Sequence, residues 1–247
     1  MSWLFPERLD TTKANFFYRL LLQSHIKRYE FASRRVKNLK VLDAACGDGY
    51  GSYILSKSAK RVVGIDISKK TIELSKRRIK ARNVAFYHCD ATSLDFPNSS
   101  FEAVVSLETI EYLSLKDTKK FLSEIKRILR LSGKLIISTP EKQNVSLGKS
   151  PLNPHHLQEY SLKEFKSLLS KYFTVTNVYG QDYAAKYQLD LFKALATGPL
   201  TKPMQIAWRI YQKLHFFPGK ISKPRGNKIP WVNIIEAYNS SRQFWWR

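Results

Sequence analysis

The segment Val41–Ser52 constrains the fold of this chain more than any other part of the sequence. An apolar run ends in Asp43, and glycines then stand at positions 47, 49 and 51, before a helix-compatible stretch. Glycine has no Cβ and tolerates a left-handed backbone, so this spacing predicts a turn at which the main chain approaches a ligand closely. Dinucleotide-binding domains, phosphate loops and plain turns all use such glycines, so the turn alone does not identify a site.

Two further apolar runs also end in an acid. The run Val62–Asp66 follows at the distance of one βαβ step, and the run Asn83–Cys89 is followed by Asp90. Parallel strands of an open α/β sheet end at one edge, where such sheets bind ligands. A carboxylate after the second strand of a nucleoside-binding sheet accepts hydrogen bonds from the ribose hydroxyls. The sequence therefore predicts three carboxylates, including Asp43, at one edge beside the glycine turn.

Strands and helices alternate from residue 39 to about residue 140, which predicts a largely parallel, doubly wound sheet. Ser68 is a predicted N-cap of a helix that runs to about Arg82. Ser114 is the predicted start of the next helix, which Ser132-Gly133 is expected to end. Ser161 and Glu164 form a predicted capping box, and Phe173–Gly180 alternates as a strand does.

As a set, these segments resemble the class I S-adenosylmethionine-dependent methyltransferases. The matching segments, in family order, are Asp43–Gly51, Gly64–Ser68 and Cys89–Ala91 for the first three motifs, then Phe101–Leu113 and Ile125–Pro140. The resemblance covers residues 25–180 and is closest to type 11 methyltransferases, those of bacterial glycan clusters and of ubiquinone-type O-methylation. It implies a Rossmann-like seven-stranded sheet, largely parallel, with helices on both faces.

Two positions depart from the family pattern. Ala45 replaces a glycine that is often found there, and Tyr112 stands where many relatives carry histidine. The competing dinucleotide-binding fold needs two residues between its second and third glycines, whereas only Tyr50 separates Gly49 from Gly51. Hydride transfer is therefore the weaker interpretation.

The resemblance also implies roles for individual residues. Asp43 would hold the amino end of the methionine moiety, directly or through water. Asp66 would hold the ribose hydroxyls and Asp90 the adenine amino group, while Gly47 and Gly49 would give close backbone approach. The remaining residues of the predicted cofactor-binding set are Ala45, Ile67, Ala91 and Leu107. Leu107 and Glu108 would border the reacting centre.

Two residues are candidates for a catalytic base. The segment Asn153–Tyr160 resembles a pattern in relatives that methylate sugars and polyprenyl quinones, and His156 falls on the histidine of that pattern. Imidazole works as a base near neutral pH, which suits a hydroxyl acceptor. Glu111 is the second candidate. A purely structural role for His156 stays open at this point.

We divide the chain into three regions. Residues 1–38 are predicted to form a helical cap, residues 39–183 the methyltransferase domain, and residues 184–247 a helical and basic-aromatic extension. Within the cap, His25–Tyr29 resembles the helix before the first motif in methyltransferases of bacterial glycan clusters, and it could cover the cofactor or pack on the sheet. Helices are expected over residues 184–196 and 204–217.

The formal net charge of +22, from 42 Lys and Arg against 20 Asp and Glu, favours partners rich in phosphate. A small-molecule or lipid-linked sugar acceptor for O-methylation is the leading interpretation. An RNA methyltransferase or RNA-binding module is the alternative, and a cofactor-binding scaffold without activity is a third option. The tail from Pro218 onward mixes lysine, arginine and tryptophan, which suits an anionic membrane surface, a nucleic acid or packing on the domain itself.

The remaining composition narrows the class of protein. No apolar stretch approaches the roughly 20 residues that span a bilayer, and no signal peptide is evident. No cluster has metal-ligand spacing, so no metal is expected. The two cysteines, Cys46 and Cys89, are expected to stay reduced. Cytoplasmic residence is the default expectation, with attachment to the inner face of the membrane through the tail left open.

Overall fold

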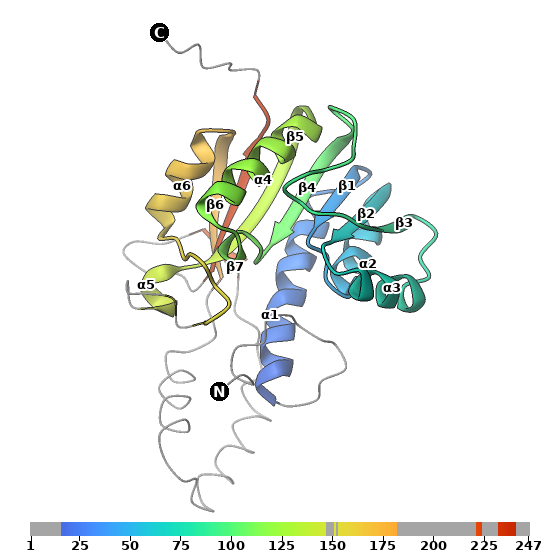
Figure 1. Cartoon of the computed structure of the whole chain (residues 1–247), viewed down its shortest axis with the longest axis horizontal. Coiled ribbons are helices and arrows are strands. Elements are labelled where there is room, and N and C mark those ends of the chain that lie inside the picture. The colour runs from blue at the N-terminus through green and yellow to red at the C-terminus, as the bar shows by residue number, and fades with distance from the viewer. Residues whose placement is uncertain (1–15, 147–150, 152, 182–220, 224–231, 241–247) are drawn as a thin grey trace, which may run out of the picture.

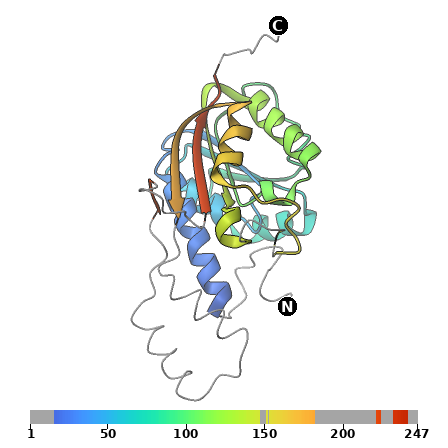
Figure 2. The same cartoon turned by 90° about the vertical axis from the view of Figure 1, so that its left-hand side faces the viewer.

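The computed structural model describes residues 16–146, 151, 153–181, 221–223 and 232–240 (Figure 1). These residues form one sheet with helices packed on both of its faces, as the edge-on view makes plain (Figure 2). The strands are β1 (Lys40–Ala44), β2 (Arg61–Asp66), β3 (Val84–His88), β4 (Phe101–Leu107), β5 (Leu129–Pro140), β6 (Thr174–Gln181), β7 (Ile221–Ser222) and β8 (Val232–Tyr238). The helices are α1 (Phe16–Ser33), α2 (Tyr50–Ser56), α3 (Lys69–Arg78), η1 (Ile110–Tyr112), α4 (Leu115–Ile128), α5 (Lys142–Val145) and α6 (Leu162–Ser170).

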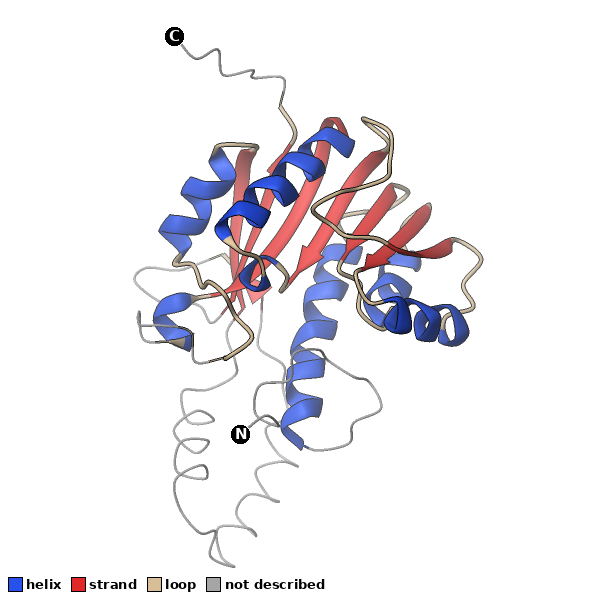
Figure 3. Cartoon of the chain, viewed as in Figure 1, coloured by secondary structure: helices blue, strands red, loops and turns tan. Residues whose placement is uncertain are grey.

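The sheet has the order β3-β2-β1-β4-β5-β8-β6-β7, and Figure 3 shows its strands side by side. The pairs among β3, β2, β1, β4 and β5 are parallel, and β8 runs antiparallel to both β5 and β6. The predicted doubly wound, largely parallel sheet is thereby confirmed. Seven strands form its core, and the short β7 adds an eighth at the edge beside β6.

The central strands are apolar at successive positions because both faces of the sheet are covered. In β1, Val41 packs in the core that contains residues of α1 and α2, whereas Leu42 packs in the core beneath α4 and α6. A strand between two helical layers must present an apolar side chain to each of them. The continuous run before Asp43 is thus the expected signature of a doubly covered strand.

The chain order reverses between β1 and β4, which lie side by side. At such a reversal the two connecting segments leave in opposite directions, and a crevice opens at the carboxyl ends of the strands. Asp43 is the residue before the last of β1 on one side of this point, and Leu107 ends β4 on the other. The fold therefore puts the predicted cofactor residues and the turn after β4 next to one another.

Three serines begin helices as predicted. Ser68, Ser114 and Ser161 each accept a hydrogen bond from the backbone three residues later, and Ser161 forms a full capping box with Glu164. Such caps satisfy N–H groups that have no partner within the helix. Helix α3 ends at Arg78, which is short of the predicted Arg82.

Helix α4 ends earlier than predicted. The helix ends at Ile128 and not at Ser132-Gly133. The next residue, the buried Leu129, already begins β5, where it pairs with Phe101 of β4. The side-chain amide of Asn239 donates to the carbonyl oxygens of Lys126 and Leu129, which stabilises this helix end from the far end of the chain.

Strand β8 overturns part of the expected domain division. Sequence reasoning assigned Val232–Tyr238 to the C-terminal extension, and the structure places it between β5 and β6. Asn233 and Glu236 interrupt the apolar pattern of this strand in the sequence. In the fold both side chains are buried and have partners. Asn233 donates to Glu141 Oε2 over 2.5 Å, and Glu236 forms an ion pair with Arg35.

The predicted N-terminal helix is confirmed from Phe16 onward. The helices expected over residues 184–196 and 204–217, and most of the basic-aromatic tail, lie outside the described residues. Among the described helices, none combines the length and the apolar character needed to cross a bilayer.

The position of β8 generates a prediction about truncation. A chain that ends at Trp231 lacks β8, so the facing edges of β5 and β6 lose their hydrogen-bonding partner and the core loses the buried Ile234 and Ile235. We expect this variant to lose cooperative thermal unfolding, as followed by circular dichroism. A chain that ends at Ser240 keeps β8 and is the matched control. A cooperative transition in the shorter chain would contradict the assigned role of β8.

Candidate active site

The carboxyl ends of β1, β2 and β3 lie next to one another, as the sequence predicts. Asp43 pairs in register with Gly64, and Asp66 pairs with His88, two residues before Asp90. The three acids therefore occupy neighbouring positions on one edge of the sheet. The charge of Asp66 acts on Asp43 closely enough to raise the pKa of Asp43.

The loop after β1 adopts the left-handed backbone that its sequence suggests. Ala45, Gly47 and Gly49 have φ angles of 63°, 56° and 86°. The backbone N–H of Cys46 donates to the Ile65 carbonyl oxygen over 2.8 Å, which ties the loop to β2. Ala45 carries a Cβ in a conformation that disfavours one, at a cost on the order of 1–2 kcal/mol. This explains why relatives often place glycine at that position.

The three glycines serve different purposes. A Cβ added to Gly47 would meet no atom within 4 Å, so this backbone faces open space, as a ligand-binding loop requires. A Cβ on Gly49 would lie 2.8 Å from the Phe86 ring, and one on Gly51 would lie 2.1 Å from the Tyr29 ring. Close approach to a ligand stays the prediction for Gly47, whereas packing against the protein's own aromatic rings explains the absence of side chains at Gly49 and Gly51.

Asp43 is fully buried at the end of β1. It accepts hydrogen bonds from the Ser52 hydroxyl at Oδ2 over 2.6 Å and from the Tyr29 hydroxyl at Oδ1 over 3.1 Å. Burial raises the pKa of Asp43 to about 7, the two hydroxyl bonds work in the opposite direction, and the charge of Asp66 adds to the rise. The same burial raises the pKa of the neighbouring Cys46 thiol.

The Asp66 carboxylate is held in place by the backbone on both sides of it. Gly47 N–H donates to Oδ2 over 3.1 Å, and Ser68 N–H donates to Oδ1 over 2.8 Å. The next residue, Ile67, leaves 61% of its surface exposed, which is unusual for a large apolar side chain. An oriented carboxylate beside an exposed apolar side chain is a suitable arrangement for a nucleoside, with its ribose hydroxyls and its flat base.

The third acid lies on a turn after β3. Asp90 is exposed, and its Oδ1 accepts a hydrogen bond from Thr92 N–H over 2.8 Å. Ala91 packs against the core, and Cys89 N–H donates to the Asp66 carbonyl oxygen. The turn is thus fastened to the end of β2, which brings Asp90 toward the predicted nucleoside site.

On the other side of the crevice, the turn after β4 carries a buried charge cluster. Leu107 is buried, and Glu108 follows it with a φ of 55°. The Ser138 hydroxyl donates to Glu108 Oε1 over 2.7 Å, and Arg28 Nη2 lies 3.7 Å from Glu108 Oε2. Arg28 also donates to Gln181 Oε1 over 2.6 Å and is almost completely buried. The sequence predicts a helix at His25–Tyr29, but no local pattern links Arg28 to Gln181.

Glu111, the second candidate base, is completely buried in η1. The Thr139 hydroxyl donates to its Oε2 over 3.4 Å, and its Oε1 has no hydrogen-bond partner among the described residues. Burial raises the pKa of Glu111 well above its ordinary value, the Glu108 charge raises it further, and the Arg28 charge opposes the rise. These effects favour the protonated form of Glu111.

His156 and Glu159 form a buried pair. His156 Nδ1 lies 2.9 Å from Glu159 Oε1, and the two side chains are only 7% and 0% exposed. The Tyr112 ring meets the His156 ring edge-on at 5.0 Å between centroids. The Glu111 carbonyl oxygen accepts hydrogen bonds from Leu157 and Gln158, which fastens this segment to the turn after β4.

Both candidate bases therefore lie on the same side of the crevice, beyond the end of β4. The structure brings His156 and Glu111 together through the backbone bonds of Leu157 and Gln158. Among the described residues, no three His, Cys, Asp or Glu side chains are grouped so that they could hold a metal ion.

Comparison with known proteins matches this architecture. Residues 42–137 match a methyltransferase domain family, and these residues contain the glycine loop, all three acids, strands β2 to β4 and most of β1 and β5. The chain therefore contains a segment similar to methyltransferase domains, and it shares the fold of S-adenosylmethionine-dependent methyltransferases.

Two curated relatives are similar to this part of the chain. A "probable S-adenosylmethionine-dependent methyltransferase" of Mycolicibacterium smegmatis is 34% identical over 63% of this chain, which spans 58% of the relative's length. A ubiquinone biosynthesis O-methyltransferase of Pelagibacter ubique is 29% identical over 50% of this chain and 52% of its own length.

A solved structure shares the fold of the methyltransferase domain. It is described as a "SAM-dependent methyltransferase, possible histamine N-methyltransferase" from Thermotoga maritima, with a TM-score of 0.63 and 16% identity. The match covers 91% of this chain and 95% of that one.

The buried Asp43 generates a prediction about stability. Its pKa is about 7 in the folded chain and near 4 when unfolded, so the folded state binds the proton more tightly. The free energy of unfolding therefore falls as the pH rises from about 4 to about 7. We expect ligand-free Asp43→Asn to exceed the wild type in stability at pH 8 by a few kcal/mol, an order-of-magnitude figure.

Urea unfolding at pH 5 and pH 8 checks this expectation, because the advantage of Asp43→Asn should shrink toward pH 5. Asp117→Asn is the control, because Asp117 is exposed and hydrogen bonding from Ser114 lowers its pKa. An Asp43→Asn variant less stable than the wild type at pH 8 would contradict the raised pKa.

Proposed function

We propose that this chain transfers a methyl group from S-adenosylmethionine to a hydroxyl of a small molecule or of a glycan or lipid-linked sugar. The observation that carries the proposal is the His156–Glu159 pair, fastened to the turn after β4 across the crevice from Asp43 and Asp66. The relatives extend beyond the region that they share with this chain, so the activity of the chain is part of the proposal.

The residues present fit the cofactor. Gly47 offers a backbone without a neighbouring side chain, the Asp66 carboxylate is oriented by two backbone N–H groups, and Ile67 is exposed beside it. We assign the methionine end to Asp43, the ribose to Asp66 and the adenine to Asp90 and Ala91. Ala45, Gly49 and Leu107 complete the predicted set as its loop and its floor.

When bound, this cofactor supplies an electrophilic methyl group on a sulfonium. The chain's own task is to align the acceptor and exclude water, and alignment can contribute roughly 7–11 kcal/mol toward lowering a barrier. Leu107, Glu111 and Glu159 are buried around the turn after β4, where we propose that the acceptor is aligned.

His156 is the proposed base. With Glu159 accepting the Nδ1 proton, Nε2 carries the lone pair and can take a proton from an acceptor hydroxyl. Glu159 orients the ring and stabilises the imidazolium that results, in the way a carboxylate supports a catalytic histidine elsewhere. Tyr112 limits the motion of the ring from its other side.

Glu111 suits a different role. Burial and the Glu108 charge raise the pKa of Glu111, so this carboxyl is better suited to donating a hydrogen bond to the acceptor than to removing its proton. Its unpartnered Oε1 is consistent with that role. We therefore place Glu111 with the acceptor-positioning groups and leave proton removal to His156.

One relative supports an oxygen acceptor, because it is named a ubiquinone biosynthesis O-methyltransferase. Peripheral attachment to an anionic membrane surface through the basic-aromatic tail remains part of the proposal, with cytoplasmic residence as its default. Within the described part of the tail, Lys223 is exposed.

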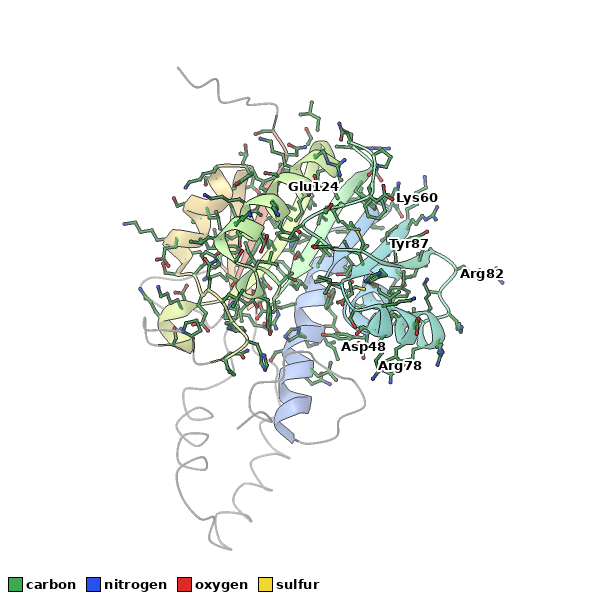
Figure 4. All side chains as sticks on the ribbon, in the orientation of Figure 1. Asp48, Lys60, Arg78, Arg82, Tyr87 and Glu124 are labelled. Atoms are coloured by element: carbon green, nitrogen blue, oxygen red, sulfur yellow. The ribbon has the colours of Figure 1, made fainter. Side chains whose placement is uncertain are left out.

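One observation favours the alternative, an RNA methyltransferase or RNA-binding module. A row of exposed basic residues covers α2, β2 and α3, and in Figure 4 Lys60 and Arg82 point outward at this end of the sheet. The row consists of Lys57, Lys60, Arg61, Lys69, Lys70, Lys76, Arg77, Arg78, Lys80 and Arg82. Such a surface attracts any phosphate-rich partner, so it supports RNA and anionic lipid alike.

Binding of the cofactor tests the role proposed for Asp66. We expect Asp66→Ala to weaken binding of S-adenosylmethionine at least tenfold, or about 1.4 kcal/mol, because the ribose loses its acceptor. Calorimetry on the purified chain measures this. Asp95→Ala removes an exposed carboxylate of the neighbouring loop and should leave the affinity unchanged. Equal affinities for all three proteins would remove the role assigned to Asp66.

The rate of methyl transfer tests the role proposed for His156. Incubating the chain with labelled cofactor and a fractionated cell extract identifies the acceptor fraction. With that acceptor, we expect His156→Gln to slow methyl transfer by about 10²–10⁴-fold while cofactor affinity stays the same. His155→Gln is the matched control, because His155 is adjacent in sequence and exposed. A His156→Gln rate within a few-fold of the wild type would exclude His156 as the base.

A further inference from the structure

Asp43 receives one of its two hydroxyl bonds from outside the methyltransferase motifs. The donor is Tyr29 on α1, whose hydroxyl reaches Asp43 Oδ1 over 3.1 Å. The other donor, Ser52, lies on α2 just after the glycine loop. Tyr29 and Asp43 are both buried, so neither bond competes with bulk water.

The site is built to receive the Tyr29 ring. Gly51 leaves room that a methyl group would fill, since a Cβ there would lie 2.1 Å from the ring. The Tyr50 ring meets Tyr29 edge-on at 5.6 Å between centroids, and Tyr29 is only 4% exposed. A ring packed this closely has one orientation, so its hydroxyl is fixed on Asp43.

We propose that Tyr29 is a positioning residue for Asp43 and that the amino-acid end of the cofactor is bound only when Asp43 has lost its proton. The proposal rests on the proposed cofactor function. It adds a means of regulation, because the affinity for any ligand with an α-ammonium group then depends on pH. Ligands that carry only the nucleoside are bound independently of this proton.

The surroundings of Asp43 favour this switch. The polar and titratable groups that act on it are Tyr29 from α1, Ser52 from α2, Cys46 from the loop and Asp66 from β2, and Tyr50 lies beside Tyr29. Burial and the like charge of Asp66 raise its pKa to about 7, against the effect of the two hydroxyl bonds. The carboxyl of Asp43 therefore changes its charge across the neutral range.

The direction of the effect follows from linkage. Below pH 7 Asp43 keeps its proton, and an ammonium group must displace it to solvent before an ion pair can form. Affinity therefore falls by up to about tenfold per pH unit below pH 7 and levels off above it. Each binding event near pH 7 releases a fraction of one proton.

S-adenosylhomocysteine and 5′-methylthioadenosine separate the two ends of the ligand. Both carry the adenosine part, but only the first carries the α-ammonium group. We expect calorimetry between pH 5.5 and pH 8.5 to show the stated pH dependence for S-adenosylhomocysteine and none for methylthioadenosine. Titrations in two buffers of different ionisation enthalpy should show proton release for the first ligand alone.

Tyr29→Phe keeps the ring packed on Gly51 and removes only the hydroxyl. Because a hydrogen bond to the charged form is lost, the pH midpoint for S-adenosylhomocysteine should rise by about one unit. Ser52→Ala should shift the midpoint in the same direction. Tyr53→Phe is the matched control on α2, since Tyr53 is 44% exposed, and it should leave the midpoint unchanged.

Three outcomes would each overturn part or all of this proposal. An affinity for S-adenosylhomocysteine that is flat with pH, while methylthioadenosine binds, overturns the switch but leaves the cofactor site in place. A Tyr29→Phe variant that binds more weakly at every pH without a shift in midpoint shows a structural role only and overturns the positioning role. Failure of both ligands to bind at any pH overturns the proposed function and this inference with it.

Discussion

The parallel pairing of β1 with β2 on one side and β4 on the other is the constraint on which the rest of the structure depends. It sets the carboxyl end of β1 at the point where the chain order reverses, so Asp43 lies between the proposed nucleoside half and the proposed acceptor half of the site. The loop that leaves β1 is tied to β2 through Cys46 and Gly47. Every proposed ligand contact is made from loops that this pairing holds in place.

Buried acidic side chains lie in both halves of the proposed site. Asp43, Glu111 and Glu159 are buried, although a carboxylate in a protein interior loses its hydration. Hydroxyls and an imidazole offset part of that loss, because Ser52 and Tyr29 donate to Asp43 and His156 pairs with Glu159. The charge of Arg28 favours the ionised form of Glu111. Sites arranged in this way trade stability for chemistry, because the strained or desolvated group is the one that meets the ligand. The stability of the ligand-free protein and its affinity for ligand are therefore linked.

Much of the cofactor half could be predicted from the sequence, because its information is local. The strand, the turn and the acid follow one another within a few residues, as Asp43, Gly47 and Asp66 show. Contacts between distant segments could not be predicted, since Arg28 and Gln181 are 153 residues apart and no short pattern joins them. Strand β8 escaped prediction for the same reason, because its buried Asn233 and Glu236 read as surface residues without their partners. The roles of Gly49 and Gly51 also depend on rings that come from other elements.

The placement of β8 has a consequence for how this protein is made. Strands β5 and β6 leave the ribosome well before the strand that belongs between them, so the sheet stays split while synthesis continues. During that interval the nascent chain presents two unpaired edges, which invite pairing with other chains. The half built from β1 to β5 contains the nearer contacts and can form first, whereas closure must wait for a segment near residue 235. Late insertion of one strand is thus a step at which a growing copy of this chain is exposed to aggregation.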